Sequence, residues 1–233
     1  MWKRCCSVCV LVFGLAGCAF ASLLDSPGAA RFVAADPSNY TAANRNVRLG
    51  RGGSDIQYII IHTTQGSYDS AINWFQNPIS NVSAHYVVRS ADGEVTQMVH
   101  EKDIAWHAGN SMYNALSIGI EHEGFIDQPD IWYTPNLYEA SAALVRDIAA
   151  RNRIPLDRAH ILGHSEVPGA THTDPGPGWD WDYYMSLVQA PEPATGWVML
   201  FGLCAAAMRR FTRHQSPRRR GVSSLAGFQP TIL

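Results

Sequence analysis

The chain has 233 residues, with 20 acidic and 18 basic residues and a formal net charge of −2. This length allows one well-packed domain with further segments at its ends. Between Ser22 and Ala190 there are 19 acidic and 10 basic residues, a net charge of −9. Such an acidic domain lacks the basic surface that nucleic-acid binding requires, so we expect no nucleic-acid partner.

Residues 1–21 have the three parts of a secretory signal peptide. Two basic residues lie in Met1–Arg4, an apolar stretch follows from Cys5 to Gly17, and Ala19-Phe20-Ala21 offers a small-residue cleavage site. We therefore expect export and removal of this segment by a signal peptidase. A second cleavage remains open, because Leu15-Ala16-Gly17-Cys18 is similar to a lipobox, which would leave Cys18 as a lipidated N-terminus.

All five cysteines lie in the terminal segments, at positions 5, 6, 9, 18 and 204. An exported domain without cysteines has no disulfide framework. Its stability must therefore come from its core or from a bound metal.

Residues 22–55 show no sustained periodicity and indicate a linker or an irregular N-terminal extension. The domain begins with a β-branched run at residues 56–61, which is typical of a central strand covered on both faces. This strand ends at His62. Ser67 is a suitable N-cap for a short helix that ends before Pro78.

Strands and helices continue to alternate further along the chain. Two strands, 85–89 and 94–99, flank an Asp-Gly step that favours a hairpin turn. Further strands are predicted at 117–121 and 159–162, and a helix with Pro135 at its first position runs from Thr134 towards Pro155. This alternation predicts an α/β fold around one mostly buried sheet.

Eight of the nine histidines lie between residues 62 and 172. One histidine at a strand end is usually structural, and an Asp-Pro-Gly sequence is usually a turn. Here, however, His62 and His164 each follow a predicted core strand, and Asp174 lies just beyond them, restricted by Pro175. Because strand ends meet at one edge of a sheet, these three side chains are expected to converge. Two imidazoles, one carboxylate and an open position are typical of catalytic zinc.

Six motifs occur in the order and spacing of the type-2 N-acetylmuramoyl-L-alanine amidase family, and the resemblance covers about residues 56–185. Peptidoglycan recognition proteins and phage lysozyme-like amidases share the fold that this implies. It is a mixed central β-sheet flanked by helices, with zinc in a surface groove. The motifs are Ile59-Ile60-Ile61-His62-Thr63-Thr64, Ser83-Ala84-His85-Tyr86, Trp106-His107-Ala108-Gly109, Ser117-Ile118-Gly119-Ile120-Glu121, Gly163-His164 and Asp174-Pro175-Gly176-Pro177.

The resemblance implies a metal set and a catalytic base. His62, His164 and Asp174 match the family's three metal ligands, which implies one Zn²⁺ per chain. Glu121 matches the acid that acts as general base on the attacking water. Glu123 is the fallback for this role, since it lies on the same face of the strand by alternation.

The resemblance implies roles for further residues, which match the family less directly. His107 matches a groove residue that contacts substrate, and Trp106 and His85 belong to the same expected substrate-binding group. His172 stands where many family members have lysine. We expect it either to donate a hydrogen bond to the oxyanion or to orient Asp174.

For residues 56–188 the resemblance implies hydrolysis of the amide between N-acetylmuramic acid and L-alanine in peptidoglycan. Two alternatives remain open. One is a peptidoglycan-binding module that keeps the metal set, has little turnover and uses its tryptophans as sugar platforms. The other is a periplasmic amidase for anhydromuropeptides in wall recycling.

Residues 189–220 resemble a PEP-CTERM sorting signal of Gram-negative bacteria, with Pro191-Glu192-Pro193, an apolar stretch and an arginine cluster. The resemblance implies transient membrane association and cleavage by an exosortase, with residues 221–233 as a disordered tail. The expected location is the periplasm, the outer membrane or the cell surface. The apolar stretch is short for a spanning helix, so a disordered basic tail is the alternative.

Overall fold

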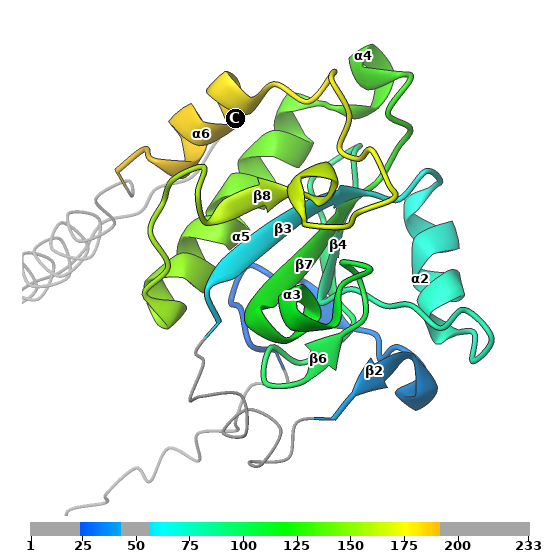
Figure 1. The fold of residues 1–233 in the computed structure, drawn as a ribbon. Helices are drawn as coiled ribbons and strands as arrows, with labels where there is room; N and C mark the ends of the chain where they lie inside the picture. Colours follow the sequence, from blue (N-terminus) through cyan, green and yellow to red (C-terminus); the bar gives the residue numbers. More distant parts are fainter. Residues whose placement is uncertain (1–23, 43–55, 192–233) are drawn as a thin grey trace, which may run out of the picture. The chain divides into compact units, whose positions relative to one another are not determined.

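The computed structural model describes residues 24–42 and 56–191 (Figure 1). A six-stranded sheet with the order β1-β5-β4-β7-β3-β8 lies at its centre. The strands β4, β7, β3 and β8 are parallel, and β5 runs antiparallel to β4. The predicted α/β class with a mixed sheet is therefore confirmed. In sheet order, the strands are β1 (Arg31–Phe32), β5 (Val95–Gln97), β4 (Tyr86–Val88), β7 (Ser117–His122), β3 (Tyr58–Thr63) and β8 (Ile161–Gly163).

The longest helix, α5 (Pro135–Asn152), packs with α6 (Trp181–Val188) on one face of the sheet. Thr134 caps α5 by accepting a hydrogen bond from the backbone of Leu137, and Arg153 ends it in a left-handed conformation. In the described ranges the remaining helices are α2 (Tyr68–Gln76), α3 (Ser111–Leu116), α4 (Pro129–Trp132) and the 3-10 turns η1 (Pro37–Asn39) and η2 (His164–Glu166).

Alternation along the strands separates a core face from a groove face. On β3, Ile59 and Ile61 pack into the core with α5 and α6, whereas Ile60 belongs to a separate cluster on the opposite face. Because side chains alternate, His62 shares the face of Ile60, away from α5. Glu121 of β7 is the register partner of His62 and follows the core residue Ile120, so it shares that face too.

The parallel strands β3, β7 and β8 end at the same edge of the sheet. His62 and Glu121 lie near the ends of β3 and β7, and His164 follows β8 directly. The topology thus brings these three side chains to one place, as expected for ligand sites at the carboxyl ends of parallel strands.

The predicted strands are confirmed, with ends that move by at most two residues, and so are the two predicted helices. The sequence did not indicate α6, whose Tyr184 and Met185 pack in the core. The expected signal peptide at residues 1–21, the expected sorting segment at 189–220 from residue 192 onwards, and the expected tail at 221–233 lie outside the described residues. Within the part of the chain that the structure describes, no helix combines the length and hydropathy needed to cross a membrane.

Residues 24–42 pack against the domain. Arg31–Phe32 adds a parallel strand beside β5, and β2 (Tyr40–Thr41) pairs with β6 (Ile104–Ala105). Asn39 is fully buried, and its side-chain nitrogen donates hydrogen bonds of 2.9 Å to the carbonyls of Phe75 and Asn77. The described part of the predicted linker or extension is therefore an ordered layer over α2.

A buried polar chain connects the groove face to the core. His122 is fully buried, with Nδ1 2.8 Å from the carbonyl of His62 and Nε2 2.7 Å from the hydroxyl of Ser141. The Ser141 hydroxyl in turn lies 2.7 Å from that of Tyr184. Since a carbonyl only accepts, Nδ1 of His122 carries the proton and Nε2 accepts from Ser141. Desolvation by burial lowers the pKa of His122 from 6.5 to about 3.

This pKa shift predicts an acid-sensitive fold. Above about pH 6.5 neither the folded nor the unfolded protein protonates His122, so its full stabilisation is present. As the pH falls towards about 3, only the unfolded chain takes up this proton, and stability is lost at up to ~1.4 kcal/mol per pH unit. Denaturant unfolding of metal-free protein between pH 6 and pH 4 should show a steeper loss for the parent than for His122→Asn. Equal slopes would contradict this pKa assignment.

Candidate metal centre and active site

The functional side chains meet in a groove of about 930 Å³ on the face opposite α5. Its walls come from the ends of the parallel strands, from the helices α2 and α3 and from the loops at residues 81–83, 106–109 and 169–174. Among the sequence-predicted site residues, seven line it: His62, Trp106, His107, Glu121, His164, His172 and Asp174.

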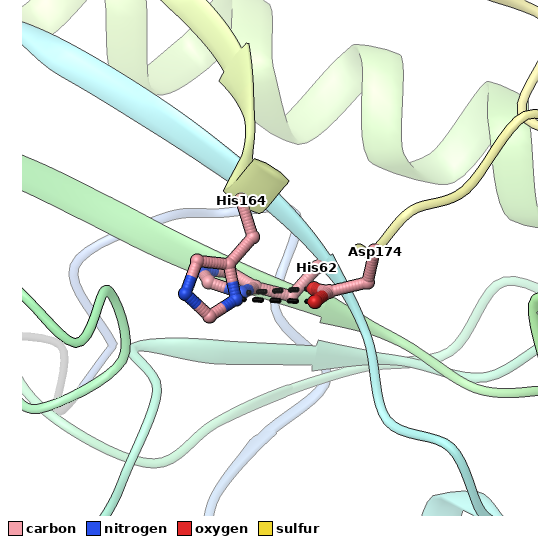
Figure 2. Close-up of side chains that lie close together, drawn as sticks. All are labelled: His62, His164 and Asp174. Carbon is pink, nitrogen blue, oxygen red and sulfur yellow. Dashed lines mark hydrogen bonds and ion pairs between the residues drawn. The ribbon is translucent and has the colours of Figure 1, made fainter. Parts of the chain in front are cut away.

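The predicted metal set converges as expected. Nδ1 of His62 lies 3.2 Å from Oδ2 of Asp174, and Nδ1 of His164 lies 3.1 Å from Oδ1 of the same carboxylate. All three side chains are buried, and one ligand atom from each lies within 4.8 Å of the others. Figure 2 shows both imidazoles turning a nitrogen towards the carboxylate.

Asp174 is held in place from its own loop and from β3. The backbone amide of Thr63 donates to Oδ2 at 3.3 Å. Tyr133 donates its hydroxyl proton to the carbonyl of Pro175 at 2.6 Å and accepts from the hydroxyl of Thr63 at 2.9 Å. At Gly163 a Cβ would lie only 2.8 Å from the ring of Pro175, so this glycine allows the loop to approach β8. The orientation of the Asp174 carboxylate therefore depends on contacts with β3 and β8.

The electrostatics of this set fit a divalent cation with nitrogen and oxygen ligands. Burial favours the neutral acid, but the interactions with the imidazoles of His164 and His62 outweigh it and hold the pKa of Asp174 well below its usual range. Burial lowers the pKa of His62, with Asp174 opposing the shift. An ionised carboxylate beside a neutral imidazole is the ligand form that Zn²⁺ requires. The residues present fit the zinc that the family resemblance implies.

Glu121 lies in the groove as a carboxylate with an unsatisfied oxygen. Its Oε2 is buried and has no hydrogen-bond partner among the described residues. Burial, and then repulsion from Asp174, raises the pKa of Glu121 well above 4.5. A carboxylate in this state is suited to accept a proton from a nearby group.

Glu123 has a different environment. Its two carboxylate oxygens accept hydrogen bonds from the backbone amides of Tyr68 at 2.9 Å and Ser90 at 2.8 Å. Tyr68 is the first residue of α2, so Glu123 stabilises the start of that helix. Both oxygens being engaged, Glu123 is a structural residue rather than the alternative base.

The predicted substrate-binding residues differ in position. Trp106 lines the groove, and its indole nitrogen donates to Thr41 at 3.0 Å. His85 is fully buried behind the groove wall and is absent from its lining. Its Nδ1 accepts a hydrogen bond from the backbone of Gly119 at 3.0 Å, and Nε2 donates to the carbonyl of Asp103 at 3.3 Å. Because both nitrogens are engaged, a contact between His85 and substrate is not expected.

His172 is exposed at the groove and stacks on His164, with ring centroids 5.0 Å apart and an interplanar angle of 12°. Within the described residues, no hydrogen bond joins His172 to Asp174. The position of His172 favours a role in the groove over a role in orienting the carboxylate of Asp174.

Two residues that hold the site, Tyr133 and Ser117, were not singled out from the sequence. Tyr133 contacts the Asp174 loop across 42 residues, and Ser117 contacts His107. Their residue types carry no chemical signature, and only the serine that opens the Ser-Ile-Gly-Ile-Glu motif could have drawn attention.

At one edge of the mixed sheet, two histidines and an aspartate that fit a metal ion lie beside a buried glutamate, and the comparisons identify the family. Residues 52–177 match the model of the family described as N-acetylmuramoyl-L-alanine amidase, Amidase_2. The chain belongs to this family and is a peptidoglycan amidohydrolase.

Individual relatives agree with this assignment. N-acetylmuramoyl-L-alanine amidase A of Achromobacter lyticus is 35% identical over 178 residues, which are 69% of this chain and 94% of that protein. The 1,6-anhydro-N-acetylmuramyl-L-alanine amidase AmpD of Enterobacter cloacae is 39% identical over 113 residues, 46% of this chain and 57% of that protein. A crystal structure of an AmpD derivative superposes with a TM-score of 0.54 at 27% identity, covering 70% of this chain and 96% of that one.

Proposed function

We propose that this protein is a zinc-dependent enzyme that cleaves the amide between N-acetylmuramic acid and L-alanine in peptidoglycan. The observation that carries the proposal is the convergence of His62, His164 and Asp174 in a groove that also holds Glu121, whose buried Oε2 has no hydrogen-bond partner in the described part of the chain. We further propose residues 56–188 as the catalytic domain.

The chain's own residues account for the proton transfers of amide hydrolysis. Bound zinc would supply Lewis acidity, which polarises the scissile carbonyl and makes water easier to deprotonate. Glu121 accepts the proton of the attacking water as the new carbon–oxygen bond forms. Its raised pKa lets it retain that proton and then donate it to the departing amide nitrogen as the carbon–nitrogen bond breaks. The products are a lactyl carboxylate and a free L-alanine amine.

His172 supplies a hydrogen bond to the oxyanion in this proposal, and a substitution pair tests it. His172→Ala should lower kcat by about 10²-fold with little change in zinc content, because one oxyanion donor is lost. His172→Lys should retain much of the activity, since an ammonium also donates. Measurement of kcat and of bound zinc in both variants checks the role. Loss of zinc in His172→Ala would instead assign His172 to the support of Asp174.

The substrate can be tested directly with two forms of cell-wall material. Purified sacculi and soluble 1,6-anhydromuropeptides are each digested with and without chelator, and the products are identified by mass spectrometry. We expect stem peptides with a free L-alanine amine from sacculi, dependent on metal. Cleavage of the anhydromuropeptides alone would indicate a recycling amidase, as the names of the AmpD relatives suggest. Binding to sacculi without cleavage of either substrate would indicate a binding module.

We also propose that the enzyme acts outside the cytoplasmic membrane of a Gram-negative bacterium. Support comes from the signal-peptide pattern of residues 1–21 and the sorting-signal pattern of residues 189–220. Signal peptidase and an exosortase are then its processing partners, and membrane association through the C-terminal segment is transient. Peptide mapping of the protein from its native envelope tests both cleavages and distinguishes them from acylation at Cys18.

A further inference from the structure

A chain of hydrogen bonds runs from His62 away from the metal set into the protein. Nε2 of His62 lies 2.9 Å from Nδ1 of His107. On the other side of that ring, Nε2 of His107 lies 3.2 Å from the hydroxyl of Ser117. Ser117 in turn donates to the backbone carbonyl of Tyr113 at 2.6 Å.

The last bond sets the direction of the others. A carbonyl can only accept, so the single hydroxyl proton of Ser117 points to Tyr113. The Ser117 oxygen must then accept from Nε2–H of His107. A neutral His107 with its proton on Nε2 presents a lone pair at Nδ1, which accepts from Nε2–H of His62. Nδ1 of His62 is therefore left unprotonated, and this is the nitrogen that faces Asp174 in Figure 2.

The position of His107 is tightly defined by its surroundings. Its side chain is buried, with 8% of the residue exposed. Its ring packs directly on the backbone of Gly119, where an added Cβ would lie 2.5 Å from Cγ of His107. The ring of His85 packs against it edge to face, with centroids 5.7 Å apart. The glycine leaves the space that the ring occupies, and His85 limits its movement.

We propose that His107 and Ser117 form a positioning pair that orients His62 and directs its Nδ1 lone pair to the metal. The proposal rests on the zinc-dependent function above and assigns His107 a role other than substrate contact. A histidine ligand whose second nitrogen donates a hydrogen bond is fixed in tautomer and ring orientation, and it becomes more basic. Here the acceptor is another imidazole, anchored by a serine, instead of a carboxylate.

Two matched substitutions at position 107 distinguish the loss of the hydrogen-bond acceptor Nδ1 from the loss of the ring's volume. His107→Leu removes the acceptor, whereas His107→Asn can place its amide oxygen near the position of Nδ1. Zinc affinity, measured by competition with a chromophoric chelator in the absence of substrate, should fall about 10- to 100-fold in His107→Leu. His107→Asn should stay within a few-fold of the parent. Ser117→Ala should weaken zinc binding in the same direction by a smaller factor.

A spectroscopic measurement tests the geometry independently of affinity. In the zinc-loaded parent, long-range ¹H–¹⁵N correlation of the histidine rings should show His62 with a proton on Nε2 and the metal at Nδ1. Metal at Nε2 would overturn the proposal. This readout and Ser117→Ala also keep the test decisive if His107→Leu does not fold, which circular dichroism of the metal-free variants will show.

The outcomes distinguish this proposal from the function on which it rests. A parent protein that binds no zinc contradicts the metal-dependent function itself. A parent that binds zinc, together with a folded His107→Leu of equal affinity and a raised KM, overturns the positioning role and assigns His107 to substrate binding. Weaker zinc binding in His107→Leu, with recovery in His107→Asn, supports the positioning pair.

Discussion

Glu121→Gln should retain zinc and substrate binding and lose about 10²- to 10⁴-fold in kcat. The amide has nearly the same shape as the carboxylate but cannot accept the proton of the attacking water. The variant should also be more stable than the parent when metal is removed. The parent buries Oε2 of Glu121 without a hydrogen-bond partner among the described residues, and burial raises the pKa of Glu121, so folding disfavours the charged form.

Glu123→Gln is the matched control, since it makes the same chemical change two residues away. The carboxylate of Glu123 accepts two backbone hydrogen bonds, and an amide can accept with only one of its two terminal atoms. We expect a stability loss of about 1–3 kcal/mol with kcat nearly unchanged. Zinc content, kcat and denaturant unfolding of both variants check this pair. Near-normal turnover of Glu121→Gln would show that another group is the base.

Removal of zinc by a chelator should abolish hydrolysis and lower the melting temperature, and added zinc should restore both. The domain between the terminal segments has no cysteines, so no disulfide compensates for the lost metal. Zinc at about 1,000 times its dissociation constant stabilises the folded state by ~4 kcal/mol. For a domain of this size, that corresponds to a shift of roughly 10 °C. Thermal unfolding across a zinc titration measures it.

Asp174→Ala provides the control for the zinc titration. Without the carboxylate, zinc should neither restore activity nor raise the melting temperature over the same concentration range. Comparable activity in a parent sample shown to be metal-free by elemental analysis would contradict a catalytic metal. A zinc-dependent melting temperature in Asp174→Ala would instead show that the stabilising ion binds elsewhere.

The metal set could be predicted because it depends on features that a sequence displays. His62 and His164 each end an apolar run, and a sheet brings such ends together. Asp174 is marked by the proline that follows it. The base followed from the family resemblance, and the alternative at Glu123 had the same strand alternation in its favour. Only the structure shows that Glu123 is occupied by the amides of Tyr68 and Ser90.

The supporting contacts could not be predicted because they join segments without a shared pattern. Alternation indicates which face of a strand His85 occupies, but not that the carbonyl of Asp103 and the amide of Gly119 close off both its nitrogens. Likewise, Tyr133 reaches the Asp174 loop through a tertiary contact that no periodicity encodes. The direction of a hydrogen-bond chain depends on which residues become neighbours in the folded protein. The identities of the residues alone do not show these neighbours.

The layer formed by residues 24–42 has a consequence for how far the catalytic unit extends. The family similarity begins at residue 52, after this segment. Yet the side chain of Asn39 donates hydrogen bonds to the carbonyls of Phe75 and Asn77 and accepts one from the backbone amide of Asn81. The hydroxyl of Thr41 accepts a hydrogen bond from the indole of Trp106. Phe75, Asn81 and Trp106 line the groove, so a separate stretch of chain supports its wall from behind. A boundary drawn where similarity starts would leave the metal ligands intact and remove the support of the surface that faces the substrate.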